Sequence, residues 1–282
     1  MQSKFVFFYN FTSTIIFCRL LSAVYRPWNT YCLYIDSKSS AEFHRMVQMM
    51  SECYNKHYNN NNNNNNNSVV VYPQPRSLVW QHSSLLDADL DCLDLLLKHD
   101  QDWKYYINIV GSEYPVITNY QLIQKIKTLS NNIGFVDIIH PWPEVAARWK
   151  YSHVLPAQSA SSSTSWFGGY YSYGPRRTQQ LKTPPPHNIT IMYGIKNVLI
   201  SREFSEFVIN SRVGQDLRSW LRDVLVAVEH FYSTLATITV SDEGIQQRFD
   251  HLDQLNMFKM RKTFWSANYH DCHGEVSQQC SD

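Results

Sequence analysis

The apolar residues at the start of the chain alternate between short runs and helical spacing. Phe5–Tyr9 and Tyr31–Ile35 are short runs of large apolar residues, which are typical of buried strands. Ile15–Tyr25 and Ala41–Tyr54 carry apolar residues three or four positions apart, which predicts helices. A strand–helix–strand–helix order with short turns predicts an α/β fold, in which helices cover the faces of a mostly parallel sheet.

The alternation continues beyond a tract of nine asparagines, Asn59–Asn67. No core can be built from asparagines, so we expect a solvated loop insertion within a single domain of residues 1–282. Val69–Tyr72 and Tyr105–Val110 are predicted strands, and Leu85–His99 is a strongly periodic helix between them. The tract therefore divides one domain without ending it.

The second half of the chain has weaker signals. Residues 159–175 and 250–282 indicate irregular structure, because they show no sustained apolar period. Thr118 is a suitable N-cap for the first of the helices predicted here. The predicted elements are a helix at Tyr120–Leu129, a hairpin or strand pair at Ile189–Tyr193 and Asn197–Ile200, and helices at Ser201–Val208 and Leu217–Val226.

Composition excludes some classes of protein. Of the 282 residues, 44% are hydrophobic and 14% aromatic, which excludes global disorder. The net charge of +1 argues against a nucleic-acid partner, since such proteins need basic residues to displace phosphate counterions. The many aromatic residues suit stacking on sugars or flat rings, although aromatics more often build the core. The apolar run Phe5–Cys18 is shorter than the ~20 residues of a spanning helix.

Six cysteines are present, which allows three disulfides in several connectivities. Glycosylation sequons begin at Asn10, Asn66 and Asn188, and they are compatible with a secretory route. The composition therefore favours an oxidising compartment.

Two clusters of metal-ligand type have simpler explanations. Asp87-Ala88-Asp89 has the DxD form of metal-dependent glycosyltransferases, but it lies within a predicted helix, so a solvated helix face is favoured. His270, Cys272 and His273 resemble part of a zinc site, although only Cys280 is available as a fourth ligand. A short-loop disulfide between Cys272 and Cys280 is the simpler interpretation.

Two carboxylates are candidates for chemistry. Asp36 closes the predicted strand Tyr31–Ile35, where ligands bind in α/β sheets, so it either contacts a ribose or base or stabilises the following turn or helix start. Glu229 stands between Val228 and Phe231, and partial desolvation there would raise its pKa towards that of a general base. Periodicity alone favours the alternative, a surface glutamate on a continuing helix.

Several sequence blocks resemble, in one order, the core-2/I-branching β-1,6-N-acetylglucosaminyltransferase family. Each block alone is a weak signal, and their shared order over roughly residues 20–235 is a specific one. The blocks are Leu20–Ser39, Ala88–Cys92, Trp103–Asn119, Arg148–Tyr151, Pro184–Thr190, Ser201–Phe204 and Glu229–Leu235.

This resemblance implies a GT-A type nucleotide-sugar transferase fold. It implies UDP-N-acetylglucosamine as the donor and the 6-hydroxyl of a galactose or N-acetylgalactosamine in an O-glycan as the acceptor. Transfer would invert the anomeric centre and would need neither a metal nor another cofactor. Members of the family act in the Golgi lumen behind a single N-terminal membrane anchor, a segment that we do not find in this sequence.

The resemblance also assigns roles to individual residues. Glu229 matches the catalytic base that removes the acceptor proton, and Asp36 matches a nucleotide-contacting position. Arg148 matches an acceptor-contacting arginine, and Asp137 stands where the family has an acceptor-contacting glutamate. Two disulfides are implied as well, Cys32–Cys92 and Cys272–Cys280.

The sequence departs from the family in its basic residues. An arginine expected before the last cysteine is missing from residues 273–279, no later lysine follows before Asp282, and Val145 replaces an acceptor-side lysine. Because the basic pair would neutralise the diphosphate, its absence predicts slow transfer. We therefore expect a truncated or divergent member. The alternatives are a catalytically impaired relative that binds glycans, or a metal-dependent transferase that uses Asp87 and Asp89.

Overall fold

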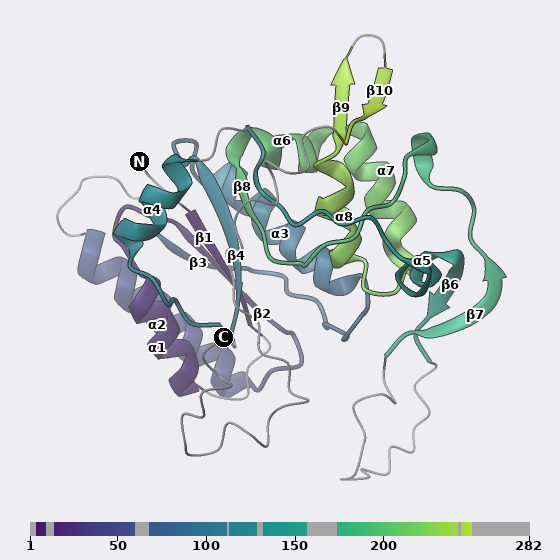
Figure 1. Cartoon of the computed structure of the whole chain (residues 1–282). Helices are drawn as coiled ribbons and strands as arrows, with labels where there is room; N and C mark the ends of the chain where they lie inside the picture. Colours follow the sequence, from purple (N-terminus) through teal and green to yellow (C-terminus); the bar gives the residue numbers. More distant parts are fainter. Residues whose placement is uncertain are drawn as a thin grey trace, which may run out of the picture.

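The computed structural model describes residues 4–9, 14–59, 68–111, 113–128, 132–156, 174–241 and 244–249. Within these residues the chain forms a mixed α/β fold around a six-stranded sheet of order β3-β2-β1-β4-β8-β5 (Figure 1). β1 pairs in parallel with β2 and β4, and β2 with β3, whereas β8 runs antiparallel to β4 and β5. The strands are β1 (Lys4–Tyr9), β2 (Tyr31–Ile35), β3 (Val69–Val71), β4 (Tyr105–Val110), β5 (Gly134–Phe135) and β8 (Leu199–Ser201).

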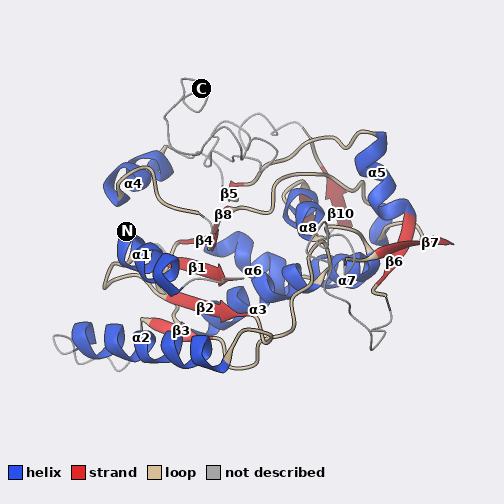
Figure 2. Ribbon diagram, turned by 90° about the horizontal axis from the view of Figure 1, so that it is seen from below, coloured by secondary structure: helices blue, strands red, loops and turns tan. Residues whose placement is uncertain are grey.

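Helices cover both faces of this sheet (Figures 1 and 2). One face is covered by α1 (Thr14–Val24), α2 (Ala41–Asn59) and α4 (Asn119–Lys127). The other is covered by α3 (Ser84–His99), α6 (Arg202–Asn210), α7 (Arg212–Trp220) and α8 (Val228–Leu235). The remaining elements lie outside the sheet: α5 (Pro143–Lys150), the 3-10 helices η2 (Pro186–Asn188) and η3 (Leu221–Asp223), and the antiparallel pairs β6 (Tyr151–Val154) with β7 (Arg176–Leu181) and β9 (Ile238–Ser241) with β10 (Gly244–Gln247).

The strand β2 explains why the sequence shows an apolar run rather than an alternation. Tyr31, Leu33 and Ile35 pack into the core on the side of α1 and α2, and Cys32 and Tyr34 pack into the core on the side of α3. All of these side chains are buried, because helices cover both faces of the strand. The Cys32–Cys92 disulfide implied by the resemblance is present and joins β2 to α3.

Local capping signals place two of the predicted helices correctly. Thr118 and Gln121 form a reciprocal capping box at the start of α4, so this helix begins where the sequence indicates. The side chain of Ser201 accepts a hydrogen bond from the backbone N–H of Phe204 and caps α6.

Two predictions for the second half of the chain are wrong. Ile189–Tyr193 and Asn197–Ile200 do not form a hairpin, because Leu199–Ser201 pairs with the distant strands β4 and β5. The helix predicted at Leu217–Val226 begins earlier and ends at Trp220, since Ser211 caps its start by accepting from Gly214 N–H. Leu221 and Val224 are buried without continuing the helix, so apolar spacing alone misplaced its end.

Other predictions fall on parts of the chain outside the described residues. These are most of the asparagine tract, most of the irregular segment 159–175, and the whole of 250–282 with Cys272 and Cys280. Among the residues that the structure does describe, none of the helices combines the length and the apolar character needed to cross a membrane.

Candidate active site

Asp36 directly follows β2, and its carboxylate is buried in the turn that leads to α2. Its Oδ1 accepts hydrogen bonds from the backbone N–H groups of Lys38 at 2.9 Å and Leu78 at 3.4 Å. Its Oδ2 lies 3.2 Å from Nζ of Lys38. The N-cap of α2 is Ser40, whose Oγ accepts from Phe43 N–H at 3.1 Å. Asp36 therefore stabilises the turn but does not cap the helix.

A hollow of about 430 Å³ lies at the carboxyl ends of β2 and β3. It is lined by Ile35 and Val71 from these strands, and by His44 from α2. The His44 ring Nε2 is 3.2 Å from the backbone carbonyl oxygen of Asp36, which brings Asp36 to the edge of the hollow. Ligands of open α/β sheets bind outside the carboxyl ends of the strands, so this hollow is a candidate donor site.

Glu229 lies in the first turn of α8, a separate helix rather than a continuation of the preceding one. Its carboxylate accepts a hydrogen bond from Nη1 of Arg148 in α5 at 2.6 Å. The two side chains are 22% and 27% exposed, so the ion pair lies at the surface of the protein. The hydrogen bond from the guanidinium group holds the Glu229 carboxylate in one orientation.

Tyr193 connects Asp137, another of the predicted site residues, with this ion pair. Its ring centroid is 5.5 Å from Cζ of Arg148. The pKa of the Tyr193 hydroxyl is raised, first by burial and then by the negative charges of Glu229 and Asp137, against a lowering by Arg148. Glu229, Arg148 and Asp137 therefore act on one phenol group, which sequence reasoning placed in a strand and missed as a site residue.

Backbone contacts hold the residues around Tyr193 in place. Ile139 and Tyr193 exchange two backbone hydrogen bonds, of 2.7 and 3.0 Å. The N–H of Gly194 donates to the backbone carbonyl of Glu229 at 2.9 Å. A Cβ on Gly194 would overlap the carbonyl oxygen of Asp137 and Oγ of Ser233, so this close approach needs glycine.

Two residues with positive φ, Gln81 and Val226, meet between the loop after β3 and the start of α8. Val226 has a φ of 56° and Gln81 a φ of 62°, and the N–H of Val226 donates to the carbonyl of Gln81 at 2.8 Å. Positive φ is rare for a β-branched residue and is found at functional sites. Gln81 lies three residues after Leu78, which donates to Asp36, and Val226 lies three residues before Glu229. This backbone hydrogen bond therefore joins the segments that lie next to the two carboxylates.

The structure does not form a metal site from the DxD string. Both residues lie in α3, where Asp87 Oδ1 is 2.7 Å from Nη2 of Arg218. Asp89 is only 1% exposed, so the expected solvated helix face is wrong for this residue, because α3 is enclosed between the sheet and α6–α8. Its carboxylate accepts hydrogen bonds from Tyr106, Asn108 and Tyr232. Both carboxylates therefore bind other side chains of the protein, which argues against the alternative of a metal-dependent transferase that uses Asp87 and Asp89.

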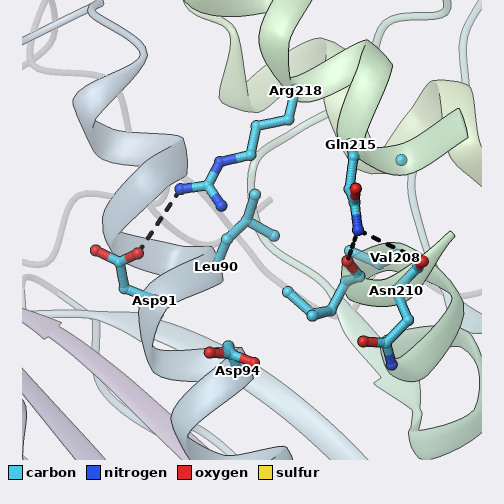
Figure 3. Close-up of a pocket in the computed structure, with 9 residues that line it drawn as sticks. Leu90, Asp91, Asp94, Val208, Asn210, Gln215 and Arg218 are labelled. Atoms are coloured by element: carbon cyan, nitrogen blue, oxygen red, sulfur yellow. Dashed lines mark hydrogen bonds and ion pairs between the residues drawn. The ribbon is translucent and has the colours of Figure 1, made fainter. Parts of the chain in front are cut away.

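A second hollow, of about 310 Å³, lies between α3 and α6–α7 (Figure 3). Gln215 donates from its side chain to the carbonyls of Ile209 and Asn210 at 3.4 and 3.5 Å, and Arg218 is 3.7 Å from Asp91. None of the predicted site residues lines this hollow.

An α/β fold with a buried acid at a strand end and a surface carboxylate held by an arginine fits a sugar-transferring enzyme. The Core-2/I-Branching enzyme family matches residues 5–281, and the chain belongs to this family.

Characterised relatives bear names from the same chemistry. The chain is 29% identical to the rat (Rattus norvegicus) β-1,3-galactosyl-O-glycosyl-glycoprotein β-1,6-N-acetylglucosaminyltransferase 3, over 94% of this chain and 54% of that protein. It is 31% identical to the mouse (Mus musculus) N-acetyllactosaminide β-1,6-N-acetylglucosaminyl-transferase, over 92% of this chain and 58% of that protein. The chain thus spans about half the length of the curated relatives it matches.

Proposed function

We propose that this chain is a glycosyltransferase domain of GT-A type. It transfers N-acetylglucosamine from UDP-N-acetylglucosamine in β-1,6 linkage to a galactose or N-acetylgalactosamine of an O-glycan. The observation that carries the proposal is the Glu229–Arg148 ion pair beside Tyr193 and Asp137, in a chain of this family. The names of the relatives, which share β-1,6-N-acetylglucosaminyl transfer, support the choice of sugar and linkage.

In the proposed mechanism, a carboxylate oxygen of Glu229 accepts the proton of the acceptor hydroxyl. The hydroxyl oxygen attacks the anomeric carbon of the donor sugar from the face opposite the diphosphate, and the bond between that carbon and the diphosphate oxygen breaks. The bonding electrons leave with UDP, and the anomeric centre inverts. Arg148 orients the Glu229 carboxylate through the hydrogen bond from its Nη1, and Asp137 accepts hydrogen bonds from acceptor hydroxyls.

The donor nucleotide would lie at the other end of the site, in the hollow beside Asp36. The mechanism uses no metal, so cationic side chains must stabilise the departing diphosphate. The family places an arginine for this purpose in the loop that corresponds to residues 273–279, which contain none. We therefore expect leaving-group stabilisation to limit the rate of this chain.

We also propose that the domain works in the Golgi lumen on glycoprotein acceptors. The Cys32–Cys92 disulfide fits an oxidising compartment. The family resemblance supplies the choice of the Golgi, and the relatives' names supply the glycoprotein acceptor.

Replacing Glu229 by Gln tests the assignment of the base. The amide keeps the size of the side chain but takes up no proton at neutral pH, so we expect product formation to fall by about 10²–10⁴-fold. The measurement is formation of the branched glycan from UDP-N-acetylglucosamine and a β-1,3-galactosyl-N-acetylgalactosamine acceptor. Glu206→Gln is the control, because Glu206 pairs with Arg202 on the exposed side of α6. Wild-type turnover by a folded Glu229→Gln protein would show that the assignment is wrong.

The lack of arginine in residues 273–279 favours a second candidate, a glycan-binding relative that has lost catalysis. Titration calorimetry with UDP separates the two candidates. Binding at or below millimolar UDP supports the enzyme, and binding of the glycan acceptor alone supports the second candidate.

A further inference from the structure

Trp142 is a large apolar side chain that the fold leaves at the surface. It is 47% exposed, although burial of so large an apolar side chain would stabilise the fold. Its ring contacts Tyr193 edge-to-face, with 5.3 Å between the centroids and 79° between the planes. The exposed indole therefore begins directly beside the ring that Arg148 contacts, and Arg148 in turn pairs with Glu229.

The backbone around Trp142 is held rigidly. Pro141 precedes it and Pro143 follows it, and each ring fixes its own φ, while Pro143 keeps Trp142 in the extended region. Trp142 occupies the N-cap position of α5 without capping it through its side chain, and its carbonyl accepts from Ala146 N–H at 2.9 Å. Because the backbone is fixed here, binding of a ligand costs less conformational entropy in this segment.

Further apolar surface lies along the same segment. Ile139 is 40% exposed and Phe249 is 38% exposed. The ring of Phe249 is 5.3 Å from that of His140, so the residues just after β10 contact the segment that leads to Trp142. The exposed side chains of Ile139 and Trp142 therefore lie on one short segment that contacts Tyr193, the residue beside Arg148.

A pyranose ring has the matching chemistry. One of its faces is made of C–H groups, which pack on an aromatic face, and its edge carries hydroxyl groups, which need charged or polar partners. Trp142 offers the aromatic surface, and the carboxylates of Glu229 and Asp137 with the guanidinium of Arg148 offer the polar partners around Tyr193.

We propose that Trp142 is the stacking platform for a pyranose ring of the acceptor glycan bound beside Glu229. This inference rests on the proposed function for the identity of the ligand, and it adds a specificity-determining residue to the site. Stacking holds the ring in place before and during transfer, so it contributes to acceptor binding more than to the chemical step.

The test measures acceptor binding and transfer separately in the full chain. We expect Trp142→Ala to weaken binding of β-1,3-galactosyl-N-acetylgalactosamine about tenfold or more in titration calorimetry, and to raise the acceptor KM to the same extent. The KM for UDP-N-acetylglucosamine should stay unchanged and kcat within about twofold, because the chemical step does not use the indole. Trp142→Phe should retain most of the affinity, whereas Trp142→Leu, which is apolar but not aromatic, should not.

Trp28 supplies the matched control, since it is 51% exposed and precedes β2 at the amino end of that strand. Trp28→Ala should leave acceptor affinity unchanged. Unchanged acceptor affinity in Trp142→Ala or Trp142→Leu, an equal loss in Trp28→Ala, or no binding of the disaccharide to the wild-type chain would each overturn the inference. Calorimetry keeps it separate from the proposed function: Trp142-dependent binding without transfer retains the platform and rejects the enzyme.

Discussion

His230 follows Glu229 in α8 and, unlike the partly exposed Glu229, is enclosed in the core. It is fully buried, with its ring 4.9 Å from that of Trp149 and its Nδ1 3.1 Å from the carbonyl oxygen of Met192. The pKa of His230 is lowered to about 4, mainly by burial, against a raising effect of the hydrogen bond with the Met192 carbonyl and with a smaller lowering by the charge of Arg148. The imidazole is therefore neutral in the folded protein near pH 7 and packs in the core behind Glu229.

This burial makes the stability of the protein sensitive to acid. The unfolded chain binds the proton at the ordinary pKa of 6.5, and the folded protein only near 4, so unfolding takes up protons between these values. The stabilisation is complete above pH 6.5 and is lost as the pH falls towards 4, by roughly 3 kcal/mol. We expect His230→Gln to be less stable at pH 7 but to lose less stability by pH 5 in urea unfolding. Parallel losses in both proteins would contradict this account.

At the scale of elements, Asp89 joins three parts of the fold. Its carboxylate in α3 accepts from Asn108 in β4 at 3.1 Å and from Tyr232 in α8 at 2.7 Å. Asn108 also donates to the carbonyl of Lys196 and accepts from Val198 N–H, both at 2.8 Å, which ties down the segment after Tyr193. The position of α8, and with it that of Glu229, therefore depends on one buried carboxyl group.

The pH dependence of Asp89 should be opposite to that of His230. Burial raises the pKa of Asp89 to about 6, and the hydrogen bonds from Tyr106, Tyr232 and Asn108 offset only part of this effect. The folded protein therefore binds the proton more tightly than the unfolded chain, and stability falls as the pH rises from about 4 through 6.

Replacing Asp89 by Asn removes this titration. The amide presents its own donor to three donor groups, so we expect a less stable protein at pH 4.5. The difference in unfolding free energy between wild type and variant should narrow by roughly 2 kcal/mol between pH 4.5 and pH 7. Urea unfolding at the two pH values measures it, and a difference that widens towards pH 7 would speak against a raised pKa.

At the scale of the molecule, the Cys32–Cys92 disulfide closes a segment with a sequence separation of 60 residues. That segment contains α2, the asparagine tract and β3, and the bond joins the central sheet to α3. Loop-closure entropy grows slowly with length, so a polar insertion inside this loop costs little. The closed loop therefore holds together the half of the sheet that carries Asp36.

Removing the disulfide should lower the unfolding free energy by about 4 kcal/mol, the chain-entropy value for a loop of this length. The measurement compares urea unfolding of the wild type with that of the Cys32→Ala, Cys92→Ala double variant, and of the wild type with and without reductant. Cys53→Ser is the control, because Cys53 is free and exposed. An equal change in the control, or none in the double variant, would contradict the prediction.

The sequence by itself determined those features that depend on neighbouring residues. The strand β2, the helix α3 and the starts of α4 and α6 follow from apolar spacing and from the caps at Thr118 and Ser201, because both signals act within a few positions. Local sequence left Glu229 with two interpretations, of which apolar spacing favoured a surface glutamate, and Arg148 and Asp137 became candidates only through the family resemblance.

The tertiary structure alone decided how distant residues meet. Arg148 and Glu229 are 81 positions apart, and Tyr193 reaches them through its pairing with Ile139. Asp89, expected at the surface, is buried because α6–α8 cover α3. A single sequence records the local preferences of each segment, whereas these contacts arise from packing one segment against another. That packing brings Glu229, Arg148 and the exposed Trp142 together around Tyr193.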